Sequence, residues 1–91
     1  MKFEWDENKN KSNLNKHGVD FNDAKKVFED ENRTNSEDKR KDYGENRWIT
    51  IGKMYKAIIL VVYTIRDATR IISARMANKK ERNSYNDNLN S

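Results

Sequence analysis

Three runs of β-branched and aromatic residues follow one another between residues 47 and 76, and they constrain the fold more than any other part of the sequence. The runs are RWITIGKM, AIILVVYT and RIISARM, separated by YK and IRDAT. Gaps this short close hairpins, so the pattern predicts an antiparallel meander. The central run, residues 57–64, is apolar on both faces and is predicted to be a middle strand covered on both sides. Arg70, Ser73 and Arg75 give the third run polar positions.

A first helix is predicted from Glu7 to about His17. Asp6 precedes it as N-cap, and Gly18 follows where a left-handed C-cap residue is expected. The basic residues in its last turn, which include His17, suit the negative end of the helix dipole. The preceding KFEW is short, alternating and aromatic, which is typical of an edge strand or an extended arm.

Two further helices are predicted, one on each side of a polar loop at residues 30–46 that has room for one short strand. The first of them begins after Asp20, and its apolar residues recur at helical spacing: Phe21, Ala24, Val27 and Phe28. The other begins at Lys79, because Asn78 and Glu81 have the spacing of a capping box. Its packing row is Ala77, Glu81, Tyr85 and Leu89, at intervals of four residues.

These elements predict a single α+β domain over residues 1–91, with two N-terminal helices, an antiparallel sheet and a C-terminal helix. A domain this small has a thin margin of stability, so a partner subunit would help it. The chain has no cysteine, which favours a reducing compartment. The N-terminus lacks an apolar segment of the signal-peptide type, and the longest apolar run, AIILVV, is far too short to span a membrane. We therefore expect a cytoplasmic protein that is not embedded in a membrane.

Positive charge is concentrated near the C-terminal end. The net charge of the chain is +4. Residues 66–82 contain six basic and two acidic residues, and this local surplus equals that of the whole chain. Such a surface attracts polyanions, of which the nucleic-acid backbone is the commonest in a cell. The alternative is a solvated basic helix with no specific ligand.

The residue types exclude several common kinds of catalytic site. Without cysteine there is no thiol nucleophile, and a single histidine excludes a two-histidine zinc motif. The three glycines are scattered and form no phosphate-binding loop, so no cofactor or metal ion is expected. RNA cleavage needs none of these, because the 2′-hydroxyl of the substrate can attack the adjacent phosphate. Cationic side chains that stabilise the extra charge suffice.

Arg75 is the first candidate for that role. It ends a predicted strand, while Lys79, Lys80 and Arg82 lie on the helix that follows, so cations from two elements could converge on one phosphate. The competing interpretation pairs Arg75 with Glu81 or with an acid of the first helix. Arg70 belongs to the same basic region and is a further candidate for RNA binding.

Four other residues each have a functional and a structural interpretation. His17 is a candidate for proton transfer, and its structural alternative is stabilisation of a helix end. Tyr85 could donate a proton, bind a phosphate or stack on a base, but its position in the packing row favours simple packing. Arg47 and Arg66 flank strands, where contact with phosphate and exposure to solvent are equally reasonable.

Four segments together resemble the BrnT family of type II toxin components. They are FEWDENK, KHGVDFNDAKKVFED, RWITIG and RIISARMANKKERNSY, and the resemblance covers nearly the whole chain apart from residues 31–45. It implies a metal-independent endoribonuclease with a fold similar to that of RelE toxins, which inhibits translation and growth. It also implies a BrnA-like antitoxin with a ribbon-helix-helix region, a possible heterotetramer of two toxins and two antitoxins, and repression of operator DNA through the antitoxin.

The resemblance also implies which residues form the site. The positions that match the family pattern are His17, Arg47, Arg66, Arg75, Glu81, Arg82 and Tyr85. Met76 lies where a basic residue is frequent in the family. Asn78 replaces the usual Thr or Ser, which should preserve the cap. A non-catalytic module that binds nucleic acid or antitoxin, and acts only in operon autoregulation, is the alternative function.

Overall fold

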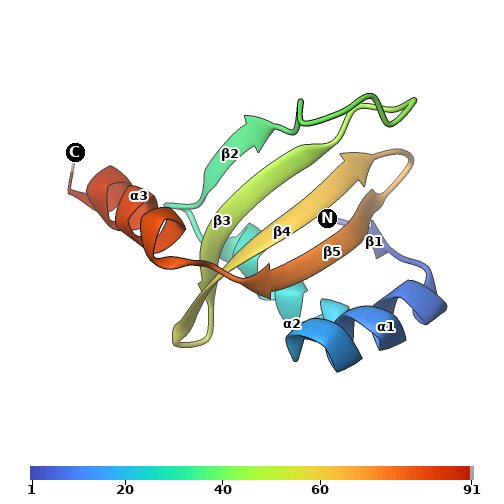
Figure 1. Ribbon diagram of the computed structural model, residues 1–91, viewed down its shortest axis with the longest axis horizontal. Helices are drawn as coiled ribbons and strands as arrows, with labels where there is room; N and C mark the ends of the chain where they lie inside the picture. The colour runs from blue at the N-terminus through green and yellow to red at the C-terminus, as the bar shows by residue number, and fades with distance from the viewer. Residues whose placement is uncertain (91) are drawn as a thin grey trace.

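The computed structural model describes residues 1–90 and contains one five-stranded sheet flanked by helices (Figure 1). In chain order, the elements of this part of the chain are β1 (Phe3–Glu4), α1 (Glu7–His17), α2 (Phe21–Ala24), the 3₁₀ helix η1 (Lys25–Glu29), β2 (Thr34–Glu37), β3 (Trp48–Met54), β4 (Ala57–Ile65), β5 (Thr69–Met76) and α3 (Lys79–Leu89). The α+β class is confirmed, and so are the positions of the N-terminal helices, the meander and the C-terminal helix.

The sheet has the strand order β1-β5-β4-β3-β2. Strands β3, β4 and β5 form the predicted antiparallel meander, and β2 adds to β3 in the antiparallel sense. At the opposite edge β1 is parallel to β5, with Phe3 opposite Thr69 and Glu4 opposite Arg70. The sheet is therefore mixed and not purely antiparallel, because β1, the first element of the chain, runs in the same direction as β5.

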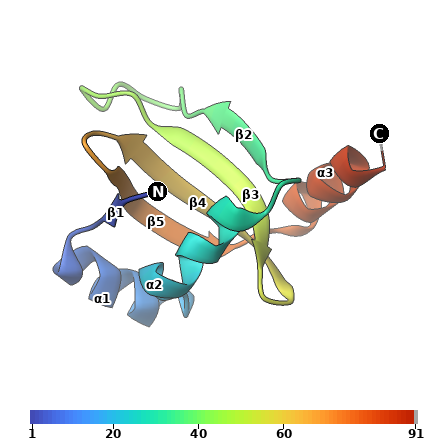
Figure 2. The same cartoon turned by 180° about the vertical axis from the view of Figure 1, so that it is seen from behind.

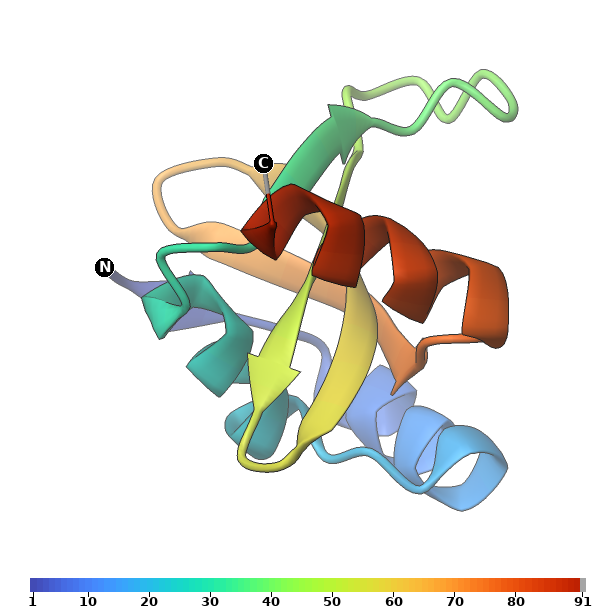
Figure 3. The ribbon, with the colours of Figure 1, turned by 90° about the vertical axis from the view of Figure 1, so that its left-hand side faces the viewer.

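One face of the sheet carries the hydrophobic core. Figure 2 shows α2 and η1 lying across this face, which we call the back face. The core consists of residues from the helical segment and from the sheet: Val19, Phe21, Ala24, Val27, Ile59, Val61, Ile71 and Ala74. The opposite, front face is the one seen in Figure 1, and no helix lies across its centre. Figure 3 shows that α3 crosses the end of the strands.

The segment predicted as one helix after Asp20 consists of two parts. Asp20 caps α2 by accepting a hydrogen bond from the Asn22 amide, as predicted, but the helix tightens to a 3₁₀ helix at Lys25. The fully buried residues of this segment are spaced by three: Phe21, Ala24 and Val27. A 3₁₀ helix has three residues per turn, so the tighter geometry keeps this row pointed at the core.

Helix α1 is held by buried asparagines instead of apolar residues. Asn13 Nδ2 donates to the Ala74 carbonyl at 2.8 Å and to the Val19 carbonyl, while its Oδ1 accepts from the Ala74 amide. Asn10 accepts from the Phe21 amide. Both asparagines are buried, whereas Leu14 is 45% exposed. β1 pairs only with Thr69 and Arg70 of β5. Farther along this edge, the Asn13 side chain takes the place of a neighbouring strand and bonds the backbone amide and carbonyl of Ala74.

The other predicted boundaries agree with the structure. Asp6 and Gly18 cap α1, and Gly18 is left-handed with φ of 72°. The capping box of Asn78 and Glu81 is present at the start of α3. In the predicted packing row of α3, Tyr85 is buried but Leu89 is 42% exposed, because α3 extends beyond the end of the strands toward its C-terminus (Figure 1).

Candidate functional site

Four arginines predicted as site residues share the front face of the sheet. The strand register places Arg75 opposite Leu60 and Arg70 opposite Thr64, and both partners alternate with the core residues of β4. Arg66 lies in the turn just after β4 and joins this group through Glu45, which it shares with Arg47. Arg47 precedes Ile49 of β3 by two residues, and Ile49 is opposite Val62 on the front face. The sheet therefore brings together arginines that are up to 28 residues apart in sequence.

Each of these arginines is already paired with a carboxylate. Arg75 donates from Nη1 and Nη2 to the two oxygens of Glu81, at 2.8 and 2.9 Å. Hydrogen bonding to Glu81 raises the pKa of Arg75, and the same bonds lower the pKa of Glu81. Glu81 also accepts from the Asn78 amide as part of the capping box. The competing interpretation of Arg75, a pair with Glu81, is thus observed, and it fixes the plane of the guanidinium at the start of α3.

A second pair of arginines shares one acid. Glu45 accepts from Arg66 Nη2 and Arg47 Nε, each at 3.1 Å. These hydrogen bonds, that from Arg66 first, lower the pKa of Glu45. The Arg47 guanidinium also lies 4.1 Å from the centre of the Tyr43 ring. Arg47 and Arg66 are therefore bridged by Glu45, and the Arg66 side chain remains 52% exposed to solvent, whereas that of Arg47 is 23% exposed.

Arg40 is a front-face cation that the sequence interpretation missed. It forms a bidentate pair with Asp38, whose side chain is fully buried, and these hydrogen bonds hold the pKa of Asp38 well below its ordinary value. As a minor cause, the positive charge of Arg40 also lowers the pKa of Glu81 and opposes the rise in the pKa of Arg75. No periodicity marks this residue, because it lies in the irregular loop after β2. The only usable signal is the short spacing of Asp38 and Arg40.

Arg70 joins the two parallel strands. Its Nη1 donates to Glu4 Oε2 at 3.0 Å, and the Arg70 side chain is 26% exposed. The pair follows directly from the parallel register, in which Glu4 lies opposite Arg70. Arg70 therefore helps to hold β1, in addition to any role in binding a ligand.

Tyr85 is buried where α3 meets the residue that follows η1. Tyr85 is 1% exposed, and its hydroxyl donates a hydrogen bond to Asp30 Oδ2 at 2.5 Å. Burial, together with the bond to Asp30, raises the pKa of Tyr85 to about 12. Burial alone would raise the pKa of Asp30, but hydrogen bonds from Tyr85 and from the Lys53 and Asn32 amides hold it below its ordinary value. This geometry fits the packing interpretation, in which Tyr85 fastens α3 to the end of η1.

The remaining candidates lie at the margins of the front face. Lys79 and Lys80 are exposed in the first turn of α3. Arg82 Nη1 donates to the Ala77 carbonyl, so this guanidinium closes the start of the same helix. His17 is half-buried at the end of α1 and lines a groove with Ile72 and Ser73. No hydrogen bond or ion pair among residues 1–90 joins His17 to an arginine.

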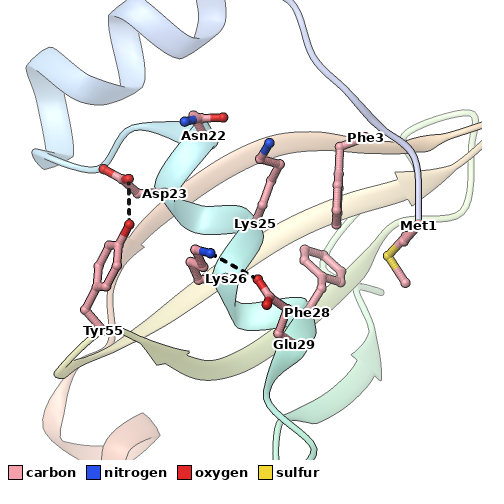
Figure 4. Close-up of a pocket in the computed structure, with 9 residues that line it drawn as sticks. All are labelled: Met1, Phe3, Asn22, Asp23, Lys25, Lys26, Phe28, Glu29 and Tyr55. Atoms are coloured by element: carbon pink, nitrogen blue, oxygen red, sulfur yellow. Dashed lines mark hydrogen bonds and ion pairs between the residues drawn. The ribbon is translucent and has the colours of Figure 1, made fainter.

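A well-formed pocket lies beside α2 and η1 and not among the arginines of the front face. Figure 4 shows this cavity of about 450 Å³ beside α2 and η1, with Phe3 and Phe28 on one side and Tyr55 on the other. The Tyr55 hydroxyl donates to Asp23, and Lys26 pairs with Glu29. None of the arginines of the front face lines it. The arginines of the candidate site are consequently separate from this cavity.

Two general findings concern the described residues. Within residues 1–90 no group of three or more His, Cys, Asp or Glu side chains is arranged to hold a metal ion. None of the helices in that range combines the length and the apolar character needed to cross a bilayer.

Comparison with known families gives one match. The family described as "Ribonuclease toxin, BrnT, of type II toxin-antitoxin system" matches residues 5–81, which include the four arginines of the front face. No curated protein matches the chain with significance.

Proposed function

We infer that this chain, which belongs to the BrnT family of ribonuclease toxins of type II toxin-antitoxin systems, cleaves RNA on the front face of its sheet without a metal ion. The observation that carries this inference is the shared face of Arg47, Arg66, Arg70 and Arg75. Four guanidinium groups on one face suit a polyanion, because each offers a planar pair of donors to a phosphate.

The chemistry requires little beyond orientation and charge stabilisation. The 2′-hydroxyl oxygen bonds to the adjacent phosphorus, and the bond from phosphorus to the 5′-oxygen breaks, which leaves a 2′,3′-cyclic phosphate and a 5′-hydroxyl. The 2′-hydroxyl proton passes to a general base, and the leaving 5′-oxygen receives a proton. We assign stabilisation of the phosphorane to Arg75, with Arg47 and Arg66 as further donors. His17 is the candidate for proton transfer.

Glu81 prepares Arg75 for this role. A guanidinium held by a bidentate carboxylate has lost its rotational freedom before RNA arrives, so less entropy is lost on binding. A phosphate competes with Glu81 for the same donors, because both present two oxygens in a plane. Lys79, Lys80 and Arg82 at the start of α3 supply additional positive charge to the incoming backbone.

The natural inhibitor would cover the same face. As a type II toxin the protein has an antitoxin partner. We propose a BrnA-like antitoxin with a ribbon-helix-helix region, which binds over the arginines, forms a heterotetramer of two toxins and two antitoxins, and contacts operator DNA. Acidic and apolar side chains of the partner would match the charge and the half-buried Ile49 and Ile51 there. A RelE-like arrangement and a cytoplasmic location belong to the same proposal.

One observation favours a second candidate function. All four arginines are paired with carboxylates, and the Tyr85 hydroxyl is buried. A non-catalytic module that binds nucleic acid or antitoxin, and contributes only to operon autoregulation, would need no free catalytic donor.

Incubation of the purified protein with 5′-labelled RNA in EDTA separates the two functions. The ribonuclease produces fragments that end in a 2′,3′-cyclic phosphate, and replacement of the nucleotide before the scissile bond by its 2′-deoxy form abolishes that cut. Intact RNA after long incubation, with RNA binding retained, would instead establish the non-catalytic module.

A further inference from the structure

A groove of about 210 Å³ runs along α1 beside β5. Its lining on the helix is a single stripe with helical spacing: Lys9, Ser12, Asn13, Lys16 and His17. Ile72 and Ser73 of β5 form the opposite side. Figures 1 and 2 show α1 alongside the outer edge of the sheet, next to β5.

The groove differs from the front face in its charge. Every front-face arginine has a carboxylate partner, but no acidic side chain lines the groove. Among residues 1–90, no ion pair involves Lys9, Lys16 or His17. The two lysines are exposed and His17 is half-buried. A polyanion in the groove would therefore meet cations without having to displace a carboxylate.

The groove is continuous with the arginines. Ser73 lines the groove and is also opposite Val62 on the front face, where it precedes Arg75 by two residues on the same strand. Asn13 fixes the distance between helix and strand, because it bonds both backbone groups of Ala74. The groove is thus part of a rigid surface that leads away from Arg75.

We propose that this groove, which we call the α1 groove, is a subsite for the RNA backbone next to the scissile phosphate. Lys9 and Lys16 contact backbone phosphates, and the Ser12 and Ser73 hydroxyls donate hydrogen bonds to phosphate or ribose oxygens. The two lysines are seven residues apart, which is about 10.5 Å along the helix. The inference rests on the proposed ribonuclease function and names the part of the substrate that this function leaves undefined.

The test is a salt titration of RNA binding. The probe is a single-stranded 2′-O-methyl oligonucleotide, which lacks the attacking hydroxyl, and binding is followed by fluorescence anisotropy. Lys9→Gln combined with Lys16→Gln should weaken binding and lower the slope of log Kd against log salt by about 1.4, at roughly 0.7 per lost phosphate contact. The matched control combines Lys11→Gln with Lys56→Gln, which removes two exposed lysines outside the groove. The control should keep the wild-type slope.

Cleavage assays complete the experiment. The groove variant should lose kcat/KM on a long RNA but keep the wild-type value on a dinucleotide that contains only the scissile bond. Equal slopes for the groove variant and the control would overturn the subsite. So would a groove variant that loses affinity for the antitoxin while it binds RNA normally. Wild-type protein that neither binds nor cleaves RNA would instead refute the proposed function itself.

Discussion

The guanidinium of Arg75 is held by both carboxylate oxygens of Glu81, at 2.8 and 2.9 Å. Arg75 ends β5 and Glu81 belongs to the first turn of α3, so the pair also fixes how the helix leaves the sheet. The Arg75 side chain remains 35% exposed, and an anion can reach it from the front face. The pair therefore has two possible roles, and variants of its two members distinguish them.

Arg75→Ala should reduce cleavage by on the order of 10² or more if Arg75 stabilises the phosphorane. Arg75→Lys should restore only part of the activity, because a point charge lacks the paired donors of a guanidinium. The measurement combines single-turnover cleavage with thermal melting of each variant. A lowered melting temperature with near-normal activity per folded molecule would reject the catalytic role.

Glu81→Gln should strengthen RNA binding. Gln retains the capping-box bond to the Asn78 amide but no longer competes as an anion for Arg75. A partly exposed ion pair contributes about 1 kcal/mol, which corresponds to roughly fivefold in Kd. Glu29→Gln is the control, because it makes the same charge change at a residue paired with Lys26 away from the front face. Equal gains in the two variants would show that only net charge matters.

Tyr85→Phe tests the buried hydroxyl. The substitution removes the hydroxyl that donates to Asp30 and leaves that carboxylate with its backbone partners. The free energy of unfolding should therefore fall by about 1 to 2 kcal/mol. Activity per folded molecule should stay close to that of the wild type. Chemical denaturation and cleavage on the same samples decide the matter. Loss of activity at unchanged stability would instead identify Tyr85 as a catalytic donor.

Asn13→Ala should be among the more destabilising single changes in α1. It removes the Asn13 partner of the Ala74 amide and carbonyl and of the Val19 carbonyl, at a cost of about 2 to 4 kcal/mol. Asn15→Ala provides the control, since Asn15 is exposed on the same helix. Urea denaturation measures both. Similar stabilities would mean that water replaces the Asn13 side chain at the edge of β5.

Stability should fall in acid. The hydrogen bonds of Arg40 lower the folded-state pKa of Asp38 below its unfolded value of about 3.9, so the unfolded chain binds the proton first. The stabilisation by Asp38 is fully present above that value and is lost as the pH falls below about 4. Melting temperatures between pH 7 and pH 3 should show this decline. Asp38→Asn should be less stable at pH 7 and decline less steeply in acid, whereas parallel curves would exclude Asp38 as a cause.

The features that the sequence alone predicted depend on residues close to one another in the chain. The caps at Asp6, Gly18 and Asn78 act within three or four positions, so their side chains meet their targets as soon as a helix forms. The continuous apolar run at residues 57–64 likewise identified the central strand, because a strand buried on both faces has no polar positions. Arg47, Arg66, Arg70 and Arg75 could be selected from residue type and from the family resemblance.

The tertiary structure alone decided which carboxylates pair with these four arginines and that the arginines share one face. Arg66 finds Glu45 across 21 residues, and Arg70 finds Glu4 across 66, only because hairpin and parallel registers align them. A bulge in β5 opposite Val62 and Tyr63 places Ile71 and Ala74, three residues apart, on the same face, which strict alternation would not predict. The polar attachment of α1 through Asn13 has no signal in hydrophobic periodicity, because its partner is the backbone of a strand 61 residues away.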